Sequence, residues 1–229
     1  MITARQAIPK YILQVSFVIV LLSACLFFSS GRANWFMGWV FIAILAGSQF
    51  SAAFILMISN PGLLANRAEI RGKRDLDRIF AGILAFFGPA AICIVAGLNK
   101  RFGWSPEIPF PVQIAGIIVA IFGSVLTVWA MASNKFFYGV LRIANEKGHT
   151  VSASGPYYFI RHPGYLGAIL FDLATPLMLN SMWALISAII TTCIIVLRTS
   201  TEDKALGNGL NGHKEYVESV RYQLLPWVW

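Results

Sequence analysis

Residues 163–198 read PGYLGAILFDLATPLMLNSMWALISAIITTCIIVLR, two apolar runs separated by little more than Asn180 and Ser181. Each run is close to the length at which a helix crosses the hydrocarbon core of a bilayer, which is about 30 Å thick. Because the connection is so short, the two runs predict a tight helical hairpin. Asp172 lies inside the first run, where a carboxylate is costly unless it is paired or hydrated. It therefore either faces a polar cavity or bonds to a neighbouring helix.

Four further apolar runs precede the hairpin, and the composition of the whole chain agrees with a membrane protein. Hydrophobic residues make up 57% of the 229 residues and charged residues only 12%, whereas soluble domains carry about 25% charged residues. We therefore predict an all-α, polytopic membrane bundle with about six spans, followed by a cytoplasmic helical tail. The expected spans are 11–29, 35–58, 79–98, 111–133, 163–180 and 182–198.

The distribution of Lys and Arg predicts the orientation of the bundle. If the N-terminus is cytoplasmic, 15 of the 18 Lys and Arg residues lie on the cytoplasmic side, and only Arg32, Lys100 and Arg101 lie opposite. This asymmetry follows the positive-inside rule. We expect a multi-pass protein of a bacterial-type inner membrane or its equivalent, with both termini in the cytoplasm. The net charge of +8 is then an orientation signal, and no nucleic-acid partner is expected.

The stretch GPYYFIRHPGYLG, residues 155–167, places polar side chains at the mouth of the hairpin. Pro163 disfavours helix at His162 and suits the first position of the next helix. The free amide groups at that helix start, together with Arg161, form a site for a carboxylate or phosphate. The alternative is that Arg161 binds lipid headgroups and His162 caps the helix.

A second polar group, formed by Arg198, Glu202 and Asp203, lies where the last span leaves the membrane. Arg198 and Glu202 are four residues apart and share a helix face. They form either an ordinary helical ion pair or an acidic site that binds a cation or takes a proton. The three cysteines lie in apolar runs and show no metal-ligand or disulfide spacing, so we expect no metal site.

Three segments in this order resemble the isoprenylcysteine carboxyl methyltransferase family, part of a group that includes phospholipid N-methyltransferases: GPYYFIRHPGYLG (155–167), RTSTED (198–203) and LNGHKEYVESVRYQLLPWVW (210–229). The resemblance covers about the last hundred residues. It implies a compact helical enzyme that binds S-adenosylmethionine on the cytoplasmic side. The acceptor is lipophilic and enters from the bilayer. Residues 1–229 would then form one domain, with four spans in 1–133 and the cofactor-binding part in 134–229.

The family's functional residues carry over by position. The expected cofactor-binding residues are Tyr157, Arg161, His162, Pro163, Tyr165, Gly167, Glu202, Asp203 and Tyr216. Arg161 and the helix start suit the cofactor's carboxylate, an acidic residue suits its ammonium, and the Tyr165 ring suits its sulfonium. His213 and Gln223 depart from the residues common in the family.

The expected catalytic residues are Arg198 and Glu202. Methyl transfer is an in-line displacement, so alignment supplies much of the acceleration. A carboxylate acceptor, such as that of a prenylated cysteine, needs only a cation such as Arg198 to position it. An amine or phenol acceptor needs a base, and Glu202 is the candidate. A small lipid or prenylated metabolite is as compatible with the sequence as a prenylated protein.

Two other functions remain open at this stage. Membrane sterol and steroid reductases resemble this group in carrying an RHPxY-like motif, and they use NADPH. In those proteins Glu commonly follows the last Gly of the motif, whereas this chain has Ala168. The acidic pair and the Tyr-containing tail favour the methyltransferase. The third possibility is a non-catalytic lipid-binding membrane protein. Binding of S-adenosylmethionine, NADPH or neither separates the three.

Overall fold

The computed structural model describes residues 4–68, 75–138 and 148–229, and every regular element in these ranges is helical. The all-α prediction is confirmed. The elements are α1 (Ala4–Ser30), α2 (Phe36–Ser59), α3 (Pro61–Ala68), α4 (Asp75–Gly82), the π-helical turn η1 (Ile83–Phe87), α5 (Gly88–Phe102), α6 (Phe110–Ser133), the 3-10 turn η3 (Gly155–Tyr158), α7 (Pro163–Met178), α8 (Met182–Gly209) and α9 (His213–Ser219).

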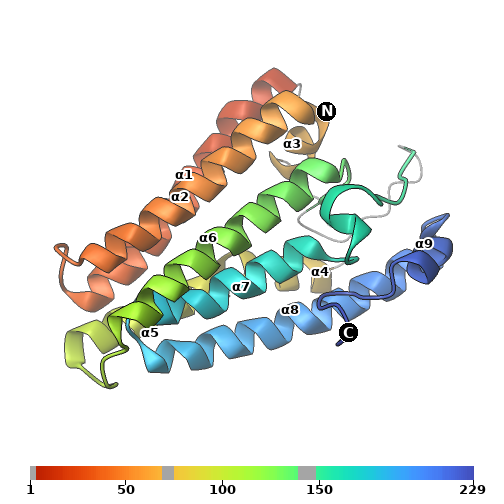
Figure 1. Cartoon of the computed structure of the whole chain (residues 1–229). Helices are drawn as coiled ribbons and strands as arrows, with labels where there is room; N and C mark the ends of the chain where they lie inside the picture. Colours follow the sequence, from red (N-terminus) through yellow and green to blue (C-terminus); the bar gives the residue numbers. More distant parts are fainter. Residues whose placement is uncertain (1–3, 69–74, 139–147) are drawn as a thin grey trace.

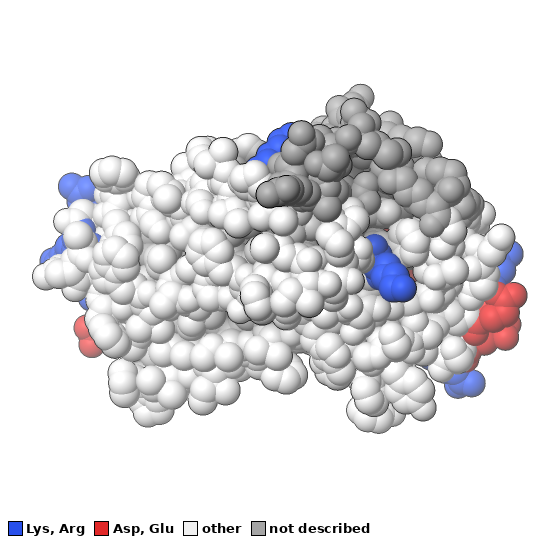
Figure 2. Space-filling model, turned by 90° about the horizontal axis from the view of Figure 1, so that it is seen from above, with Lys and Arg blue, Asp and Glu red and all other residues white. Residues whose placement is uncertain are grey.

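The long helices run side by side in one elongated bundle, and both chain termini lie toward the same end of it (Figure 1). Five described segments are long and apolar enough to cross a membrane: 7–30, 36–59, 79–102, 110–133 and 182–209. The sixth expected span is α7, which is shorter at 16 residues. On the face shown in Figure 2, most charged residues lie toward the two ends and leave a broad uncharged area between them. The prediction of a multi-pass membrane protein is thus confirmed.

The predicted hairpin is formed by α7 and α8, which are joined at Asn180 and Ser181. Asn180 adopts a left-handed conformation with φ of 57°, which Asn tolerates better than most residues. Its backbone oxygen accepts a hydrogen bond from the Asn99 side chain (3.0 Å). Ser181 caps α8, because its hydroxyl oxygen accepts from the Ala184 amide (3.3 Å). The turn is therefore fixed by its own residues and by a neighbouring helix.

Helix α7 packs against α6 through glycines. A Cβ atom added at Gly167 would lie 2.5 Å from the Gly123 backbone oxygen and even closer to the Thr127 hydroxyl. In the other direction, a Cβ at Gly123 would lie 2.6 Å from the Gly167 oxygen. The two backbones therefore touch, as small residues allow in membrane helices. This contact sets the position of α7, whose first residues carry the candidate site.

Candidate functional site

The chain around Arg161 and His162 is joined to the C-terminal tail by backbone hydrogen bonds. The backbone amide of Arg161 donates to the backbone oxygen of Tyr222, and that of His162 donates to the backbone oxygen of Gln223, both at 2.9 Å. The tail thus lies alongside the residues that precede α7. Pro163 is the first residue of α7, as its sequence context predicts.

Arg161 is buried and held by protein groups. Its guanidinium donates twice to the Asp203 carboxylate, from Nε to Oδ1 (3.0 Å) and from Nη2 to Oδ2 (2.9 Å). Its Nη1 donates to the backbone oxygens of Val220 (2.9 Å) and Arg221 (2.7 Å). These contacts use four of the five N–H groups of an arginine. Arg161 therefore connects the start of α7 to α8 and to the tail.

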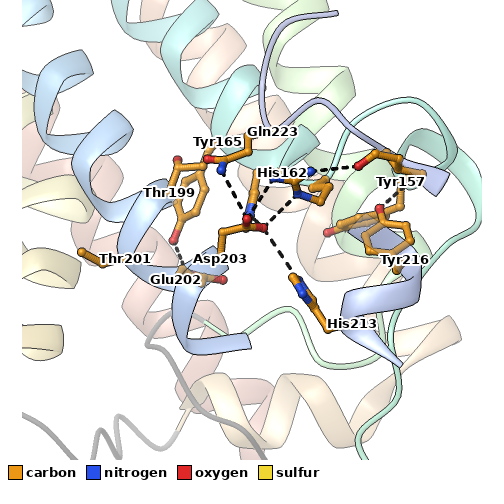
Figure 3. Close-up of polar contacts among 12 residues, drawn as sticks. Tyr157, His162, Tyr165, Thr199, Thr201, Glu202, Asp203, His213, Tyr216 and Gln223 are labelled. Carbon is orange, nitrogen blue, oxygen red and sulfur yellow. Dashed lines mark hydrogen bonds and ion pairs between the residues drawn. The ribbon is translucent and has the colours of Figure 1, made fainter. Parts of the chain in front are cut away.

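Asp203 is the centre of this polar cluster (Figure 3). Besides Arg161, His162 Nε2 lies 3.1 Å from Oδ1, and Gln223 Nε2 donates to Oδ2 at 3.2 Å. His213 Nε2 lies 3.7 Å from Oδ1. One carboxylate thereby joins α8, the start of α7, α9 and the tail. Sequence reasoning matched Arg161 and Asp203 to opposite charges of one ligand, and the structure pairs them with each other.

A second group of polar side chains lies beside the first and links Tyr165 of α7 to α8. The Tyr165 hydroxyl donates to Glu202 Oε2 (2.6 Å) and accepts from Arg198 Nε (2.9 Å). The direct distance from Arg198 Nη2 to Glu202 Oε2 is 4.0 Å. The two charged groups therefore interact mainly through the tyrosine hydroxyl. Arg198 is 3% exposed, whereas the Glu202 side chain is 24% exposed, so Glu202 is the more accessible of the two.

His213, which the sequence offered only as a departure from a family pattern, lies within the site. The residue is 3% exposed, and its Nδ1 has no hydrogen-bond partner among the residues that the structure describes. Burial lowers the pKa of His213 below its usual value, although the nearby Asp203 opposes this shift. The imidazole is thus neutral at pH 7 and keeps one ring nitrogen available. Its departure from the residue common in the family was the signal that could have identified it.

Tyr216 and Tyr157 are joined by one short hydrogen bond. The Tyr216 hydroxyl donates to the Tyr157 backbone oxygen at 2.6 Å. Burial is the main reason that the pKa of Tyr216 rises to about 12, so the hydroxyl keeps its proton at neutral pH. This bond holds α9 against η3, and the two tyrosines form one wall of the site.

A cavity of about 760 Å³ extends from the polar cluster into the bundle, within the usual size range of ligand sites. Seven of the expected site residues line it: Tyr157, Arg161, His162, Tyr165, Arg198, Glu202 and Tyr216. Asp203, Pro163 and Gly167 are not among the lining residues, and Gly167 faces α6 instead. The apolar walls, which sequence reasoning did not identify, include Val18, Leu22, Phe41, Leu45, Ile92 and Phe171.

The part of the chain that carries the two polar groups matches a known protein family. Residues 116–208 match the model of the isoprenylcysteine carboxyl methyltransferase family. The matched range begins within α6, includes all of α7 and ends near the end of α8. It therefore contains Arg161, Glu202 and Asp203 but not the tail, which is bonded to Arg161 and Asp203.

Two named relatives agree with this family. The chain is 25% identical over 181 residues to the protein-S-isoprenylcysteine O-methyltransferase of Rattus norvegicus, covering 78% of this chain and 60% of the rat protein. It is 33% identical over 69 residues to a probable protein-S-isoprenylcysteine O-methyltransferase of Oryza sativa subsp. indica, covering 30% of this chain and 36% of the rice protein. The matched region thus spans less than two thirds of the length of either relative.

A solved structure has the same fold. It is the eukaryotic intramembrane Ras methyltransferase isoprenylcysteine carboxyl methyltransferase, solved without a monobody. The TM-score is 0.52 at 17% sequence identity, over 94% of this chain and 85% of that chain. The helical arrangement is therefore shared across nearly the whole of this protein.

Proposed function

We propose that this chain, which belongs to the isoprenylcysteine carboxyl methyltransferase family, is an S-adenosylmethionine-dependent methyltransferase that acts on a lipophilic acceptor. The observation that carries the proposal is the cavity, which joins a polar cluster at the bundle end to apolar walls deep inside. A polar methyl donor and an apolar acceptor chain require such a site. The most specific acceptor we propose is the carboxylate of a prenylated cysteine.

The residues around the cluster fit the methyl donor. S-adenosylmethionine supplies an electrophilic methyl group and carries a carboxylate, an ammonium and an adenosine. Glu202 is accessible and suits the ammonium, whereas Arg161 and the start of α7 suit the carboxylate. The unpartnered Nδ1 of His213 is a buried polar atom at the cavity wall. Such an atom is costly to leave unpaired, so a polar ligand group there would relieve the cost.

The chain's own residues suit a carboxylate acceptor. A carboxylate has no proton to lose, so the site needs a cation to orient it rather than a base. Arg198 lines the cavity and is fixed through Tyr165. We assign Arg198 to the acceptor carboxylate and Glu202 to the donor. If the acceptor were an amine or a phenol, Glu202 would instead have to take its proton.

We further propose that the site faces the cytoplasm of a bacterial-type inner membrane or its equivalent. The excess of Lys and Arg on the side of the termini supports this orientation. In Figure 1 both termini lie toward the end of the bundle that carries α9 and the start of α7. Lipid acceptors would enter laterally from the surrounding bilayer, and the aromatic tail 224–229 would rest at the interface.

The direct test is calorimetry of S-adenosylhomocysteine binding to the purified protein. We expect binding by the wild type and at least tenfold weaker binding by Arg161→Ala, because this change removes the cation proposed for the donor's carboxylate and also the partner of Asp203. Arg221→Ala is the matched control, since Arg221 is exposed and contributes only its backbone oxygen to Arg161. Binding of NADPH instead would indicate a reductase. Binding of neither would leave a non-catalytic lipid-binding protein.

The Glu202→Gln variant should distinguish the two roles considered for Glu202, which are a contact with the donor's ammonium and a general base. With a carboxylate acceptor, we expect the KM for S-adenosylmethionine to rise about tenfold, because one charge-assisted contact is lost. The kcat at saturating donor should change by less than about threefold, since no proton is removed. Steady-state methyl transfer measures both constants, with the exposed Glu218→Gln as control. A kcat reduced about a hundredfold would instead make Glu202 a base and exclude the carboxylate.

A further inference from the structure

The unpartnered nitrogen of His213 is a hydrogen-bond acceptor. Nε2 lies 3.7 Å from Asp203 Oδ1, and a carboxylate only accepts hydrogen bonds, so the neutral ring carries its proton on Nε2. Nδ1 then has a free lone pair. A Cβ atom added at Gly207 would lie 3.8 Å from Nδ1, so the glycine leaves a gap beside it. Figure 3 shows the His213 ring on the side of Asp203 away from Tyr165.

His213 lies where the cavity continues past the charged residues, toward the end of α8. Arg198, Glu202, Leu206 and Leu210 line the cavity at intervals of four residues, as residues on one helix face should. At about 1.5 Å per residue, Leu206 lies about 6 Å beyond Glu202. The His213 backbone amide donates to the Leu210 backbone oxygen (3.3 Å), and His213 also lines the cavity. This outer end therefore combines two leucine side chains with one buried acceptor.

The outer end of the cavity suits the adenine of the methyl donor. The proposed function places the methionyl group of the donor at Arg161 and Glu202, and the acceptor chain among the apolar walls deep in the bundle. The adenosine is left to lie toward the end of α8. The flat faces of adenine can pack against Leu206 and Leu210. The 6-amino group is the only N–H donor of this base, because its ring nitrogens accept hydrogen bonds.

We propose that His213 determines the specificity for the methyl donor by accepting a hydrogen bond at Nδ1 from the 6-amino group of adenine. The proposal rests on the proposed function, which requires this donor. A base without the amino group would cover Nδ1 and leave it unpaired, which is costly for a buried acceptor. Sites built to bond an N–H group strongly reject analogues that lack it.

The test compares the binding of S-adenosylhomocysteine with that of its 6-deamino analogue, in which hydrogen replaces the amino group. In calorimetry with the wild type, we expect the analogue to bind at least tenfold more weakly. His213→Phe should bind S-adenosylhomocysteine at least tenfold more weakly than the wild type and bind the two compounds about equally. His213→Asn should keep part of the preference, because its amide oxygen can accept in place of Nδ1. Lys214→Met changes an exposed neighbour in α9 and should behave as the wild type.

Equal binding of the two compounds by the wild type would overturn the proposal, because Nδ1 would then pair with water or with a ribose hydroxyl. A preference that His213→Phe retains in full would overturn it as well. An unchanged unfolding temperature shows that each variant is folded, and the wild-type comparison does not depend on any variant. Failure of the two proposals differs in outcome. Binding of neither compound would refute the proposed function, whereas equal binding of both would refute the role of His213 alone.

Discussion

Replacement of Asp203 by asparagine should lower the free energy of unfolding by about 3 kcal/mol, because breaking a buried ion pair leaves one charge uncompensated. Asp203 receives two hydrogen bonds from Arg161 and one from Gln223. In the variant, an amide NH2 group would replace one carboxylate oxygen and face the N–H groups of Arg161. The loosened tail should also weaken S-adenosylhomocysteine binding at least tenfold.

Reversible denaturation in mixed micelles measures the stability, and calorimetry measures the binding. Glu218→Gln is the control, because it removes the same charge from an exposed position of α9. It should change both quantities little, since exposed charges contribute about 1 kcal/mol or less. If Asp203→Asn were as stable as this control, the ion pair with Arg161 would not hold the tail in place.

Gly167→Ala should destabilise the protein by about 2 to 3 kcal/mol, near the upper range for overpacking a closely packed site. The added Cβ would meet the backbone oxygen of Gly123, and a backbone atom cannot rotate away as a side chain can. Helices α6 and α7 would have to separate. Because α7 begins beside Arg161 and His162, this separation should reduce ligand binding as well.

Gly47→Ala is the matched control for this prediction. Gly47 also lies within a long helix, α2, but a Cβ there would contact nothing within 4 Å. Alanine is the better helix former by about 1 kcal/mol, so Gly47→Ala should be neutral or stabilising. Thermal unfolding of both variants in the same detergent gives the comparison. If Gly167→Ala had the same unfolding temperature as Gly47→Ala, α6 and α7 would not touch as closely as described.

The membrane helices could be predicted from the sequence because hydropathy is a local property. The runs 35–58 and 111–133 correspond to α2 and α6 within one residue at each end. The end of the last helix could not be predicted in this way. The apolar run stops at Arg198, yet α8 continues to Gly209. Its charged continuation is stabilised by contacts with α7 and the tail, and hydropathy does not report such contacts.

The candidate site was only partly predictable, for a different reason. Residue types identified Arg161 and Asp203 as charged groups near a membrane surface. Their charges alone, however, are equally compatible with each residue binding a ligand and with the two residues binding each other. Their pairing depends on how α7 and α8 lie against each other. The unpartnered nitrogen of His213 and the cavity-facing position of Asp172 are likewise properties of the packed bundle. No local pattern predicts them.

If the chain catalyses the proposed reaction, the depth of the polar cluster affects how its rate should depend on concentration. At about 1.5 Å per residue, Asp203 lies about 31 Å along α8 from Met182, close to the hydrocarbon thickness of about 30 Å. An acceptor can reach this level while its chain stays in the bilayer, which avoids about 0.8 kcal/mol for each CH2 group that would otherwise enter water. The relevant substrate concentration is then the mole fraction of acceptor among the surrounding lipids. Diluting the membrane with inert lipid should slow turnover, whereas diluting the suspension with buffer should not.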